Sequence, residues 1–303
     1  MKETYHQPVL LTESMDALCI REDGIYADVT FGGGGHSAAI LERLGAGGRL
    51  IAFDQDADAW KNAPSDPRFT LVTENFRHLQ RFLKLHNALP VNGILADLGV
   101  SSHQFDTPQR GFSTRYDGDL DMRMDARGKQ TASSLINEAS EAELHRIFEQ
   151  FGEVSNAKTL ARHIADARKG FPIRRISELK AIIDPLVKGN PQRYLAQVFQ
   201  ALRIAVNDEL GALKDMLQQA SEVLAPGGRL VVITFHSLED RLVKQFMRCG
   251  TFEAKNHEPS MNETKAIHNL KQVFKKPVVA SREEQSLNPR SRSAKLRVAE
   301  KQH

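Results

Sequence analysis

A run of four glycines separates a short apolar segment from a helical pattern. The run, Gly32–Gly35, follows Gly24–Thr30, which has the apolar and β-branched character of a buried strand, and precedes a helical pattern over Ser37–Leu44. Glycine allows the backbone to turn sharply and to approach a ligand closely. A helix that begins in such a loop offers its N-terminus to an anionic or polar nucleotide cofactor. The run therefore predicts a cofactor-binding loop.

Two aspartates lie at or near the carboxyl ends of predicted strands that follow this loop. Asp54 ends the strand Arg49–Asp54, about 20 residues after the loop, where an acid accepts hydrogen bonds from ribose hydroxyls. The simpler alternative is a glycine-rich turn with Asp54 as an ordinary helix N-cap. Asp97 lies in the strand Val91–Gly99, whose carboxyl end faces the cofactor and the reacting atom in a doubly wound sheet. Asp97 could bind the amino-acid part or the adenine of a methyl donor, or orient a substrate amine.

The glycine pattern alone does not select the cofactor. Gly33, Gly35 and Ala38 have the spacing of the dinucleotide fingerprint, so a nicotinamide-dependent oxidoreductase remains an alternative that an NAD(P)H titration would detect. The segment from Asp97 to Ser102, Asp-Leu-Gly-Val-Ser-Ser, favours a methyl donor instead. DNA methyltransferases that modify an exocyclic amine carry a Pro-Pro-aromatic loop at this place, and the sequence contains no Pro-Pro pair. DNA is therefore not the expected substrate.

The elements that position these residues alternate between strands and helices. Such alternation predicts an α/β fold with a doubly wound, Rossmann-like parallel sheet. A turn at Pro226–Gly228 leads into the fifth strand, and Ala294–Ala299 is predicted to be a last edge strand. The five other predicted strands are Gly24–Thr30, Arg49–Asp54, Phe69–Val72, Val91–Gly99 and Arg229–Phe235.

A long interruption separates the fourth and fifth strands. Residues 105–194 are mostly polar and helical in pattern, with amphipathic segments at Ser140–Phe151 and Ser155–Arg168. We expect them to form an inserted helical subdomain for substrate recognition. Residues 1–104 and 195–303 would then make up one discontinuous α/β domain. Within it, residues 253–293 lack strong periodicity and are expected to be rich in loops.

The composition excludes several classes of protein. Of the 303 residues, 41% are hydrophobic and 26% are charged, as in globular enzymes. No apolar run approaches the roughly 18 residues that a membrane span needs, and the sequence begins without a signal-peptide pattern. The two cysteines form no CxxC pair, which argues against a disulfide framework and a cysteine-based zinc site. A cytoplasmic protein with no membrane partner is expected.

Basic residues concentrate in the last part of the chain. From Lys265 to His303, ten lysines and arginines, among them Arg290 and Arg292, face three acids. This excess of positive charge suits a phosphate backbone, although a solvated surface tail is the simpler alternative. Arg241 lies with Lys244 and Arg248 on one predicted helix face, which either contacts phosphates or is an ordinary solvated face.

Two further groups of polar residues have both a chemical and a structural interpretation. His236 ends the fifth strand, so it either contacts the substrate or belongs to a helix start capped through Ser237. Asp119, Asp121 and Asp125 could suggest a metal site, but they lack the EF-hand spacing. We interpret these three acids as part of a structural turn and predict no metal site.

Eight motifs occur in the order found in one known family. The chain resembles the RsmH/MraW family of bacterial ribosomal RNA small-subunit methyltransferases over nearly its whole length. The motifs are His6–Leu11, Thr30–Ser37, Asp97–Ser102, Arg110–Ser113, Leu120–Asp125, Phe199–Leu210, Phe235–Arg241 and Asn288–Ser293. The chain departs from the family at Asn190–Val198, which replaces its His-Pro-Ala-Thr-Arg-type segment, and Thr251–Leu287 has no counterpart among the family's motifs.

The resemblance implies a class I methyltransferase fold and S-adenosylmethionine as cofactor. It implies methylation of the exocyclic N(4) amine of a cytidine in the decoding (P-site) region of 16S ribosomal RNA, with a role in rRNA processing and translational fidelity. The implied cofactor contacts are Gly34, Gly35, His36, Asp54, Phe76, Asp97 and Gln104. Phe76 and Gln104 follow from the resemblance alone.

The resemblance also bears on partners. The substrate would be 16S rRNA within the small ribosomal subunit, and a homodimer is compatible with the sequence. His236, Arg241, Arg290 and Arg292 are candidate RNA contacts, and Asp97 is the candidate for orienting the amine. A non-catalytic RNA-binding or assembly factor with the same fold remains an alternative, which the intact glycine loop and acids argue against.

Overall fold

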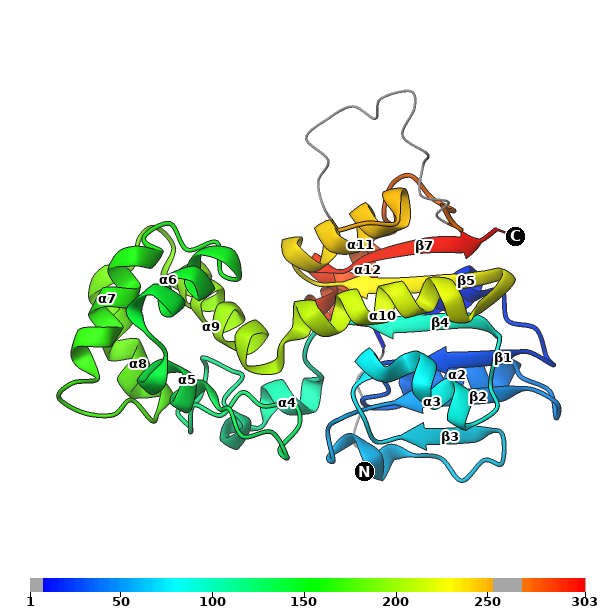
Figure 1. Ribbon diagram of the computed structural model, residues 1–303, viewed down its shortest axis with the longest axis horizontal. Helices are drawn as coiled ribbons and strands as arrows, with labels where there is room; N and C mark the ends of the chain where they lie inside the picture. Colours follow the sequence, from blue (N-terminus) through cyan, green and yellow to red (C-terminus); the bar gives the residue numbers. More distant parts are fainter. Residues whose placement is uncertain (1–7, 253–268, 303) are drawn as a thin grey trace. The chain divides into compact units, whose positions relative to one another are not determined.

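The computed structural model describes residues 8–252 and 269–302, so His6 and Lys265 lie outside the described residues. The chain divides into two compact units, one of residues 1–99 and 210–303 and the other of residues 100–209 (Figure 1). The second unit begins five residues earlier and ends fifteen residues later than the expected segment 105–194. Each unit has a hydrophobic core of its own.

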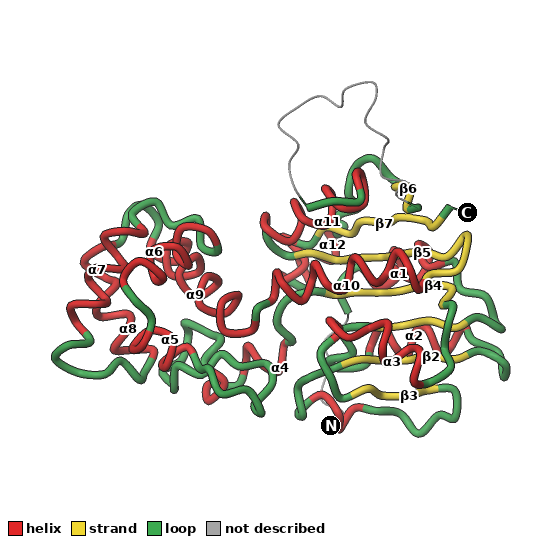
Figure 2. The backbone as a smooth tube through the Cα atoms, viewed as in Figure 1, coloured by secondary structure: helices red, strands yellow, loops and turns green. Residues whose placement is uncertain are grey.

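The first unit is built on a seven-stranded sheet (Figure 2). Its strand order is β3-β2-β1-β4-β5-β7-β6, and all neighbours from β3 to β5 run parallel. β7 runs antiparallel to both β5 and β6. The strands are β1 (Ile25–Asp28), β2 (Arg49–Phe53), β3 (Phe69–Val72), β4 (Val91–Asp97), β5 (Leu224–Thr234), β6 (Leu270–Gln272) and β7 (Lys295–Lys301). The mixed α/β fold with its Rossmann-like parallel sheet confirms the predicted fold class.

Two predictions about the last strands were wrong. β7 covers the predicted edge strand but lies inside the sheet, because the short strand β6 pairs with its outer side. β5 begins at Leu224, before the turn at Pro226–Gly228. The turn residues are accommodated by a register shift, in which Leu224 pairs with Val91 and Arg229 pairs with Gly93.

Helices cover both faces of this sheet. On one face, α3 (Leu79–Leu85), α10 (Glu209–Val223) and α11 (Ser237–Cys249) pack on the strands in a shared apolar core. On the other face, α1 (Leu11–Leu18) and α2 (Gly35–Arg43) do the same. The remaining elements are α12 (Arg282–Leu287) and the 3₁₀ helices η1 (Ala59–Asn62), η2 (Phe76–His78) and η5 (Pro289–Ser293). Two covered faces explain why the central strands are apolar on both sides.

The second unit is helical. Its core includes Tyr194, Val198 and Leu202 of its last helix, so that helix belongs to this unit over its whole length and extends it beyond residue 194. The described elements are α4 (Ser102–Asp106), η3 (Pro108–Arg110), α5 (Ala132–Glu138), α6 (Glu141–Gln150), α7 (Ala157–Ala167), α8 (Ile176–Ile183), η4 (Asp184–Leu186) and α9 (Pro191–Asn207). Among residues 8–252 and 269–302, no helix combines the length and the apolar composition needed to cross a membrane.

Candidate active site

The glycine loop connects β1 to α2 at the carboxyl edge of the parallel strands. Gly32 has φ +50° and Gly34 has φ +78°, a left-handed conformation that side chains rarely adopt. A Cβ atom on Gly35 would lie 2.3 Å from the Cγ atom of Pro8. Glycine is therefore required at Gly34 by the backbone angle and at Gly35 by the close approach of Pro8. The loop presents the N-terminus of α2 at this edge, as the sequence predicted.

Asp54 follows β2 and joins it to the glycine loop. Its Oδ2 atom accepts a hydrogen bond from the backbone N–H of Gly32 at 2.7 Å, and its Oδ1 atom accepts one from Asp56 at 2.8 Å. Burial raises the pKa of Asp54 to about 6, although these two hydrogen bonds act against the rise. Asp58, not Asp54, occupies the N-cap position of η1. The alternative of Asp54 as an ordinary helix N-cap is therefore wrong.

Asp97 ends β4 beside the loop. Its Oδ1 atom is buried and has no hydrogen-bond partner among the described residues. Its Oδ2 atom lies 3.7 Å from the Nδ1 atom of His36, and its backbone N–H donates to the hydroxyl of Thr30 at 2.6 Å. Burial, together with the nearby charges of Asp28 and Glu239, raises the pKa of Asp97 well above its usual range. Buried carboxylate oxygens without partners are rare, and they concentrate where a ligand supplies the missing donor.

Asp28 and His36 are two buried polar residues close to Asp97. The carboxylate of Asp28 is 1% exposed and accepts hydrogen bonds from the Ser37 hydroxyl at 2.7 Å and from the Thr30 N–H at 3.1 Å. His36 is 6% exposed, and its Nε2 atom lies 3.1 Å from the carbonyl oxygen of Val9. Because a carbonyl can only accept, Nε2 carries the proton and neutral His36 presents an unprotonated Nδ1 atom to Asp97. Burial lowers the pKa of His36, which favours this neutral form.

Phe76 lies at the same edge, at the start of η2. It is partly buried against the apolar core of its face. Asn75 caps the 3₁₀ helix by accepting a hydrogen bond from the N–H of Arg77 at 2.9 Å, and it donates to the side chain of Gln55 at 2.8 Å. Since Gln55 directly follows Asp54, this contact ties the strand end that bears Asp54 to the turn that bears Phe76. The Asn-Phe pair after β3 was an N-cap signal that the sequence analysis missed.

Gln104 belongs to the helical unit. It is buried, and its Oε1 atom accepts a hydrogen bond from the Ser101 N–H at 3.0 Å while its own N–H donates to the Ser101 hydroxyl at 3.1 Å. This reciprocal pair is a capping box that starts α4. The role of Gln104 in the cofactor pocket stays a prediction.

His236 caps α11 itself, so the predicted cap through Ser237 was wrong. The N–H of Glu239 donates to the Nδ1 atom of His236, and the Glu239 carboxylate accepts from the N–H of Phe235 at 2.9 Å and from that of His236 at 3.3 Å. Glu239 is 2% exposed. The imidazole thus has a structural task at the end of β5, and contact with RNA stays a prediction. Arg241 is exposed one turn further along α11.

The remaining basic candidates lie around η5. Arg290 is half-buried and its N–H donates to the side chain of Asn288 at 3.2 Å, while Arg292 is exposed. Further along the chain, Lys295 and Arg297 of β7 both bind the carboxylate of Asp240 in α11. The basic stretch is therefore partly structural, and Arg292 is the exposed member of the predicted pair.

The acidic loop of the helical unit is an array of ion pairs. Asp121 binds Arg123 at 2.6 Å, and Asp125 binds Arg127 at 2.9 Å. Asp119 lies 3.7 Å from Arg175. Each acid thus faces a guanidinium group, as expected of a structural turn.

The comparison with known proteins decides the family. The sequence pattern of the MraW methylase family matches residues 3–302. The chain belongs to this family. The family membership predicted from the eight motifs is therefore confirmed. Because the family is one of methylases, it argues against the nicotinamide-dependent oxidoreductase. The Asn190–Val198 segment, which departs from the family, forms the start of α9 with Asn190 as N-cap and Pro191 in the first turn.

Relatives in the family are similar over their full lengths. A protein named "Ribosomal RNA small subunit methyltransferase H" from Bacteroides thetaiotaomicron is 54% identical, with 98% of each chain covered. A protein of the same name from Flavobacterium johnsoniae is 52% identical, again with 98% of each chain covered. One solved structure that is matched over a similar share of both chains is far more distant in sequence. A putative rRNA methylase from Clostridium thermocellum is 14% identical, with a TM-score of 0.42 and coverage of 97% of this chain and 98% of the other.

Proposed function

We propose that this member of the MraW methylase family transfers a methyl group from S-adenosylmethionine to the exocyclic N(4) amine of a cytidine in the decoding (P-site) region of 16S rRNA. The observation that carries the proposal is the buried, unpartnered Oδ1 atom of Asp97 beside a glycine loop. An amine N–H supplies the donor that this oxygen lacks. The relatives named as small-subunit rRNA methyltransferases support the choice of RNA. The small ribosomal subunit would be the partner and the cytoplasm the compartment.

The residues at the carboxyl edge fit such a methyl donor. The N–H groups of Gly35 and His36 at the start of α2 would hold its carboxylate, because a helix N-terminus attracts anions. Gly34, whose own N–H donates to the carbonyl of Phe31 at 2.8 Å, would let the donor approach the backbone closely. Asp54 would accept the ribose hydroxyls and Phe76 would pack on the adenine. Once bound, the donor supplies an electrophilic methyl group. The chain itself contributes orientation and electrostatics.

Asp97 would act directly on the amine. The nitrogen lone pair of a cytosine amine is delocalised into the ring, which makes the amine a poor nucleophile. A carboxylate that accepts an N–H hydrogen bond favours the pyramidal form, in which the lone pair is available. When the N–C bond forms, the nitrogen must lose a proton, and the Oδ1 atom of Asp97 is the acceptor. The unprotonated Nδ1 atom of His36 faces the other carboxylate oxygen, Oδ2, at 3.7 Å, so it does not compete with the amine for Oδ1.

The test is identification of the product. Incubation with labelled S-adenosylmethionine and small ribosomal subunits from a strain that lacks its own copy should yield cytidine methylated on its exocyclic amine, detected by mass spectrometry of the nucleosides. Methylation at another atom would overturn the N(4) assignment. No incorporation into subunits, their precursors or naked rRNA would favour the non-catalytic RNA-binding factor.

Cofactor binding should depend on the charge of Asp54. The ionised carboxylate accepts hydrogen bonds from ribose hydroxyls, whereas the protonated form has lost part of this capacity. Because the pKa of Asp54 is about 6, the affinity for S-adenosylhomocysteine should be constant above about pH 7 and fall about tenfold per pH unit below pH 6. Calorimetric titrations between pH 5 and 8 measure this. The Asp54→Asn variant should bind more weakly and lose the acid-side fall, and an unchanged pH profile in that variant would contradict the assignment.

A further inference from the structure

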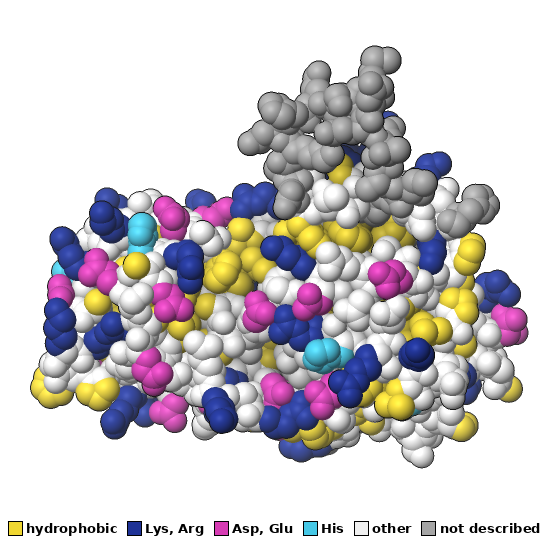
Figure 3. Space-filling model, viewed as in Figure 1, with side chains coloured by type: hydrophobic (Ala, Val, Ile, Leu, Met, Phe, Trp, Pro, Cys, Tyr) yellow, Lys and Arg dark blue, Asp and Glu magenta, His cyan; other side chains and the backbone are white. Residues whose placement is uncertain are grey.

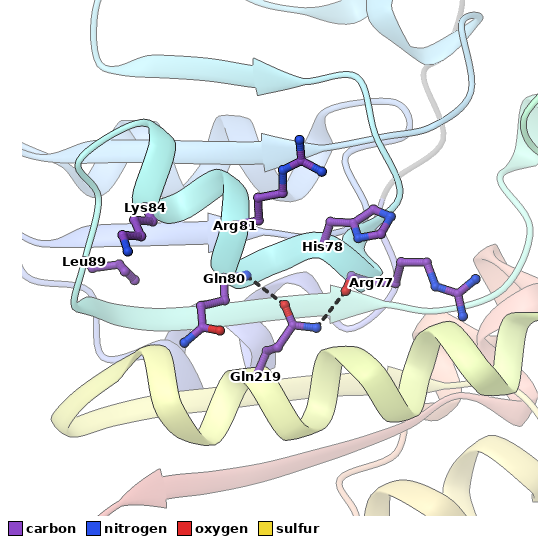
Figure 4. A pocket seen from close by; sticks show the side chains of 7 residues that line it. All are labelled: Arg77, His78, Gln80, Arg81, Lys84, Leu89 and Gln219. Atoms are coloured by element: carbon purple, nitrogen blue, oxygen red, sulfur yellow. Dashed lines mark hydrogen bonds between the residues drawn. The ribbon is translucent and has the colours of Figure 1, made fainter.

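A groove separate from the glycine loop lies between η2–α3 and α10. It has a volume of about 590 Å³ and is lined by Arg77, His78, Gln80, Arg81, Lys84, Leu89 and Gln219. Gln219 of α10 joins its two walls, because its amide accepts a hydrogen bond from the N–H of Gln80 at 2.9 Å and donates to the carbonyl of Arg77 at 2.6 Å (Figure 4). These two hydrogen bonds therefore fix η2–α3 against α10 at the groove.

The lining of this groove is cationic. Three of its seven side chains are lysine or arginine, one is histidine, and none is acidic. Arg77 is held by Asp215 at 2.9 Å, so part of its charge is compensated. Arg81 and Lys84 are exposed and have no ion pair within the part of the chain that the structure describes. Lysine and arginine are interspersed with acids over this face of the molecule (Figure 3), whereas the lining of the groove contains no acidic side chain.

The three cations follow a regular spacing. Arg77 in η2 and Arg81 and Lys84 in α3 follow one another along the η2–α3 segment at intervals of four and three residues, and we call this row of cations the stripe. His78 lies at one end of this segment and Lys84 at the other (Figure 4). Seven helical residues span about 10 Å, a length of helix axis along which each strand of a double helix presents about three phosphates. The stripe therefore matches a phosphate backbone better than it matches a single compact anion.

The groove begins next to the candidate active site and leads away from it. Its first residue, Arg77, directly follows Phe76 at the carboxyl edge of the sheet. α3 then runs back towards the opposite edge, where Leu89 precedes β4. A strand whose base enters the site beside Asp97 and Phe76 can thus continue along the stripe.

We propose that this groove binds the phosphate backbone of the RNA substrate next to the target nucleotide. The inference rests on the proposed function, since it assumes that the base acted on belongs to RNA. Arg81 and Lys84 supply the free positive charges, and Arg77 with Gln219 fixes their position. A base that has been taken out of its stack stays in place only when the backbone next to it is bound. The cations of the groove bind the phosphates of that backbone.

The experiment compares the double variant Arg81→Gln/Lys84→Gln with the double variant Arg21→Gln/Arg43→Gln. Arg21 and Arg43 are exposed on the same unit, and the control pair removes the same net charge. Binding of naked small-subunit rRNA is measured from 50 to 200 mM salt. The groove variant should bind about tenfold or more weakly at 0.1 M salt, and its slope of log affinity against log salt should be smaller by about 2. Its KM for subunits should rise while kcat and the affinity for S-adenosylhomocysteine stay unchanged.

Other results would overturn the proposal. Equal RNA binding by the groove variant and the wild type would remove the groove from the RNA interface. An equal loss in the control pair would show a general effect of net charge. Saturable binding of inorganic polyphosphate that is lost in the groove variant, with RNA binding intact, would assign the groove to a small phosphorylated ligand. Product identification with the wild-type enzyme tests the proposed function separately, so the two can fail independently.

Discussion

The Asp97→Asn variant should lower kcat for methyl transfer by about 10³-fold while the protein still binds S-adenosylhomocysteine. Asparagine keeps the shape of the side chain, but its amide cannot take up the proton that the amine loses, and proton transfer of this kind contributes about 10² to 10⁴-fold. Single-turnover transfer to small subunits measures the loss. Asp16→Asn, a change at an exposed carboxylate on α1, is the matched control and should be neutral. More than a tenth of the wild-type rate in Asp97→Asn would exclude Asp97 as the proton acceptor.

The same variant should be more stable than the wild type at high pH. The folded pKa of Asp97 lies above its unfolded value, so the unfolded chain gives up this proton first as the pH rises. Stability is therefore lost between the unfolded and the folded pKa, and it stays lost above both. Asparagine does not titrate, which predicts a higher unfolding midpoint for Asp97→Asn at pH 8 and no advantage at pH 4. A gain in stability coupled to a loss of activity is typical of an active-site residue.

Replacement of Asp240 by alanine should destabilise the α/β unit by about 3 to 5 kcal/mol. Arg297 is 7% exposed and binds the carboxylate of Asp240 at 2.7 and 3.2 Å, with Lys295 at 3.2 Å. Removal of the acid leaves a buried guanidinium group without its counter-charge, a defect that costs this much in buried pairs. The free energy of unfolding in urea measures the effect.

Two controls test the reason for that loss. Asp240→Leu combined with Arg297→Met replaces both charges by apolar groups and should recover most of the stability, because no buried charge remains. Asp166→Ala breaks an ion pair with Lys169 in which the two side chains are 61% and 75% exposed, and it should change the free energy of unfolding little. If Asp240→Ala were as mild as Asp166→Ala, the buried pair would not be a major support of β7 against α11.

The sequence predicts the parallel strands well because each is a short, apolar and β-branched run. β2 and β3 agree with their predicted bounds to within one residue. β6 was missed because three residues are too few to show a period, and its presence moved β7 from the edge to the interior. The limits of the helical unit also differ from the expected segment 105–194. Only the packing of the folded chain shows that α9 belongs to this unit along its whole length.

The candidate site could be predicted in part. Glycine spacing and strand-end acids pointed to the loop, Asp54 and Asp97. Phe76 and Gln104 depended on family resemblance, because neither has a pattern of its own. Asp28 was missed as a site residue, since its hydrogen bonds to Ser37 and Thr30 exist only after the loop has folded. Hydrogen bonds between residues on different elements have no signature in a single sequence.

The split arrangement of the sheet has a consequence for biosynthesis. β4 ends at Asp97, and its parallel partner β5 begins only at Leu224. At ordinary rates of translation, the nascent chain waits on the order of ten seconds before that partner emerges. During this interval β4 presents an open, apolar hydrogen-bonding edge, which invites mispairing with other chains. The helical unit is continuous in sequence and can form meanwhile, so the yield of folded enzyme should respond to chaperones that shield the unfinished sheet.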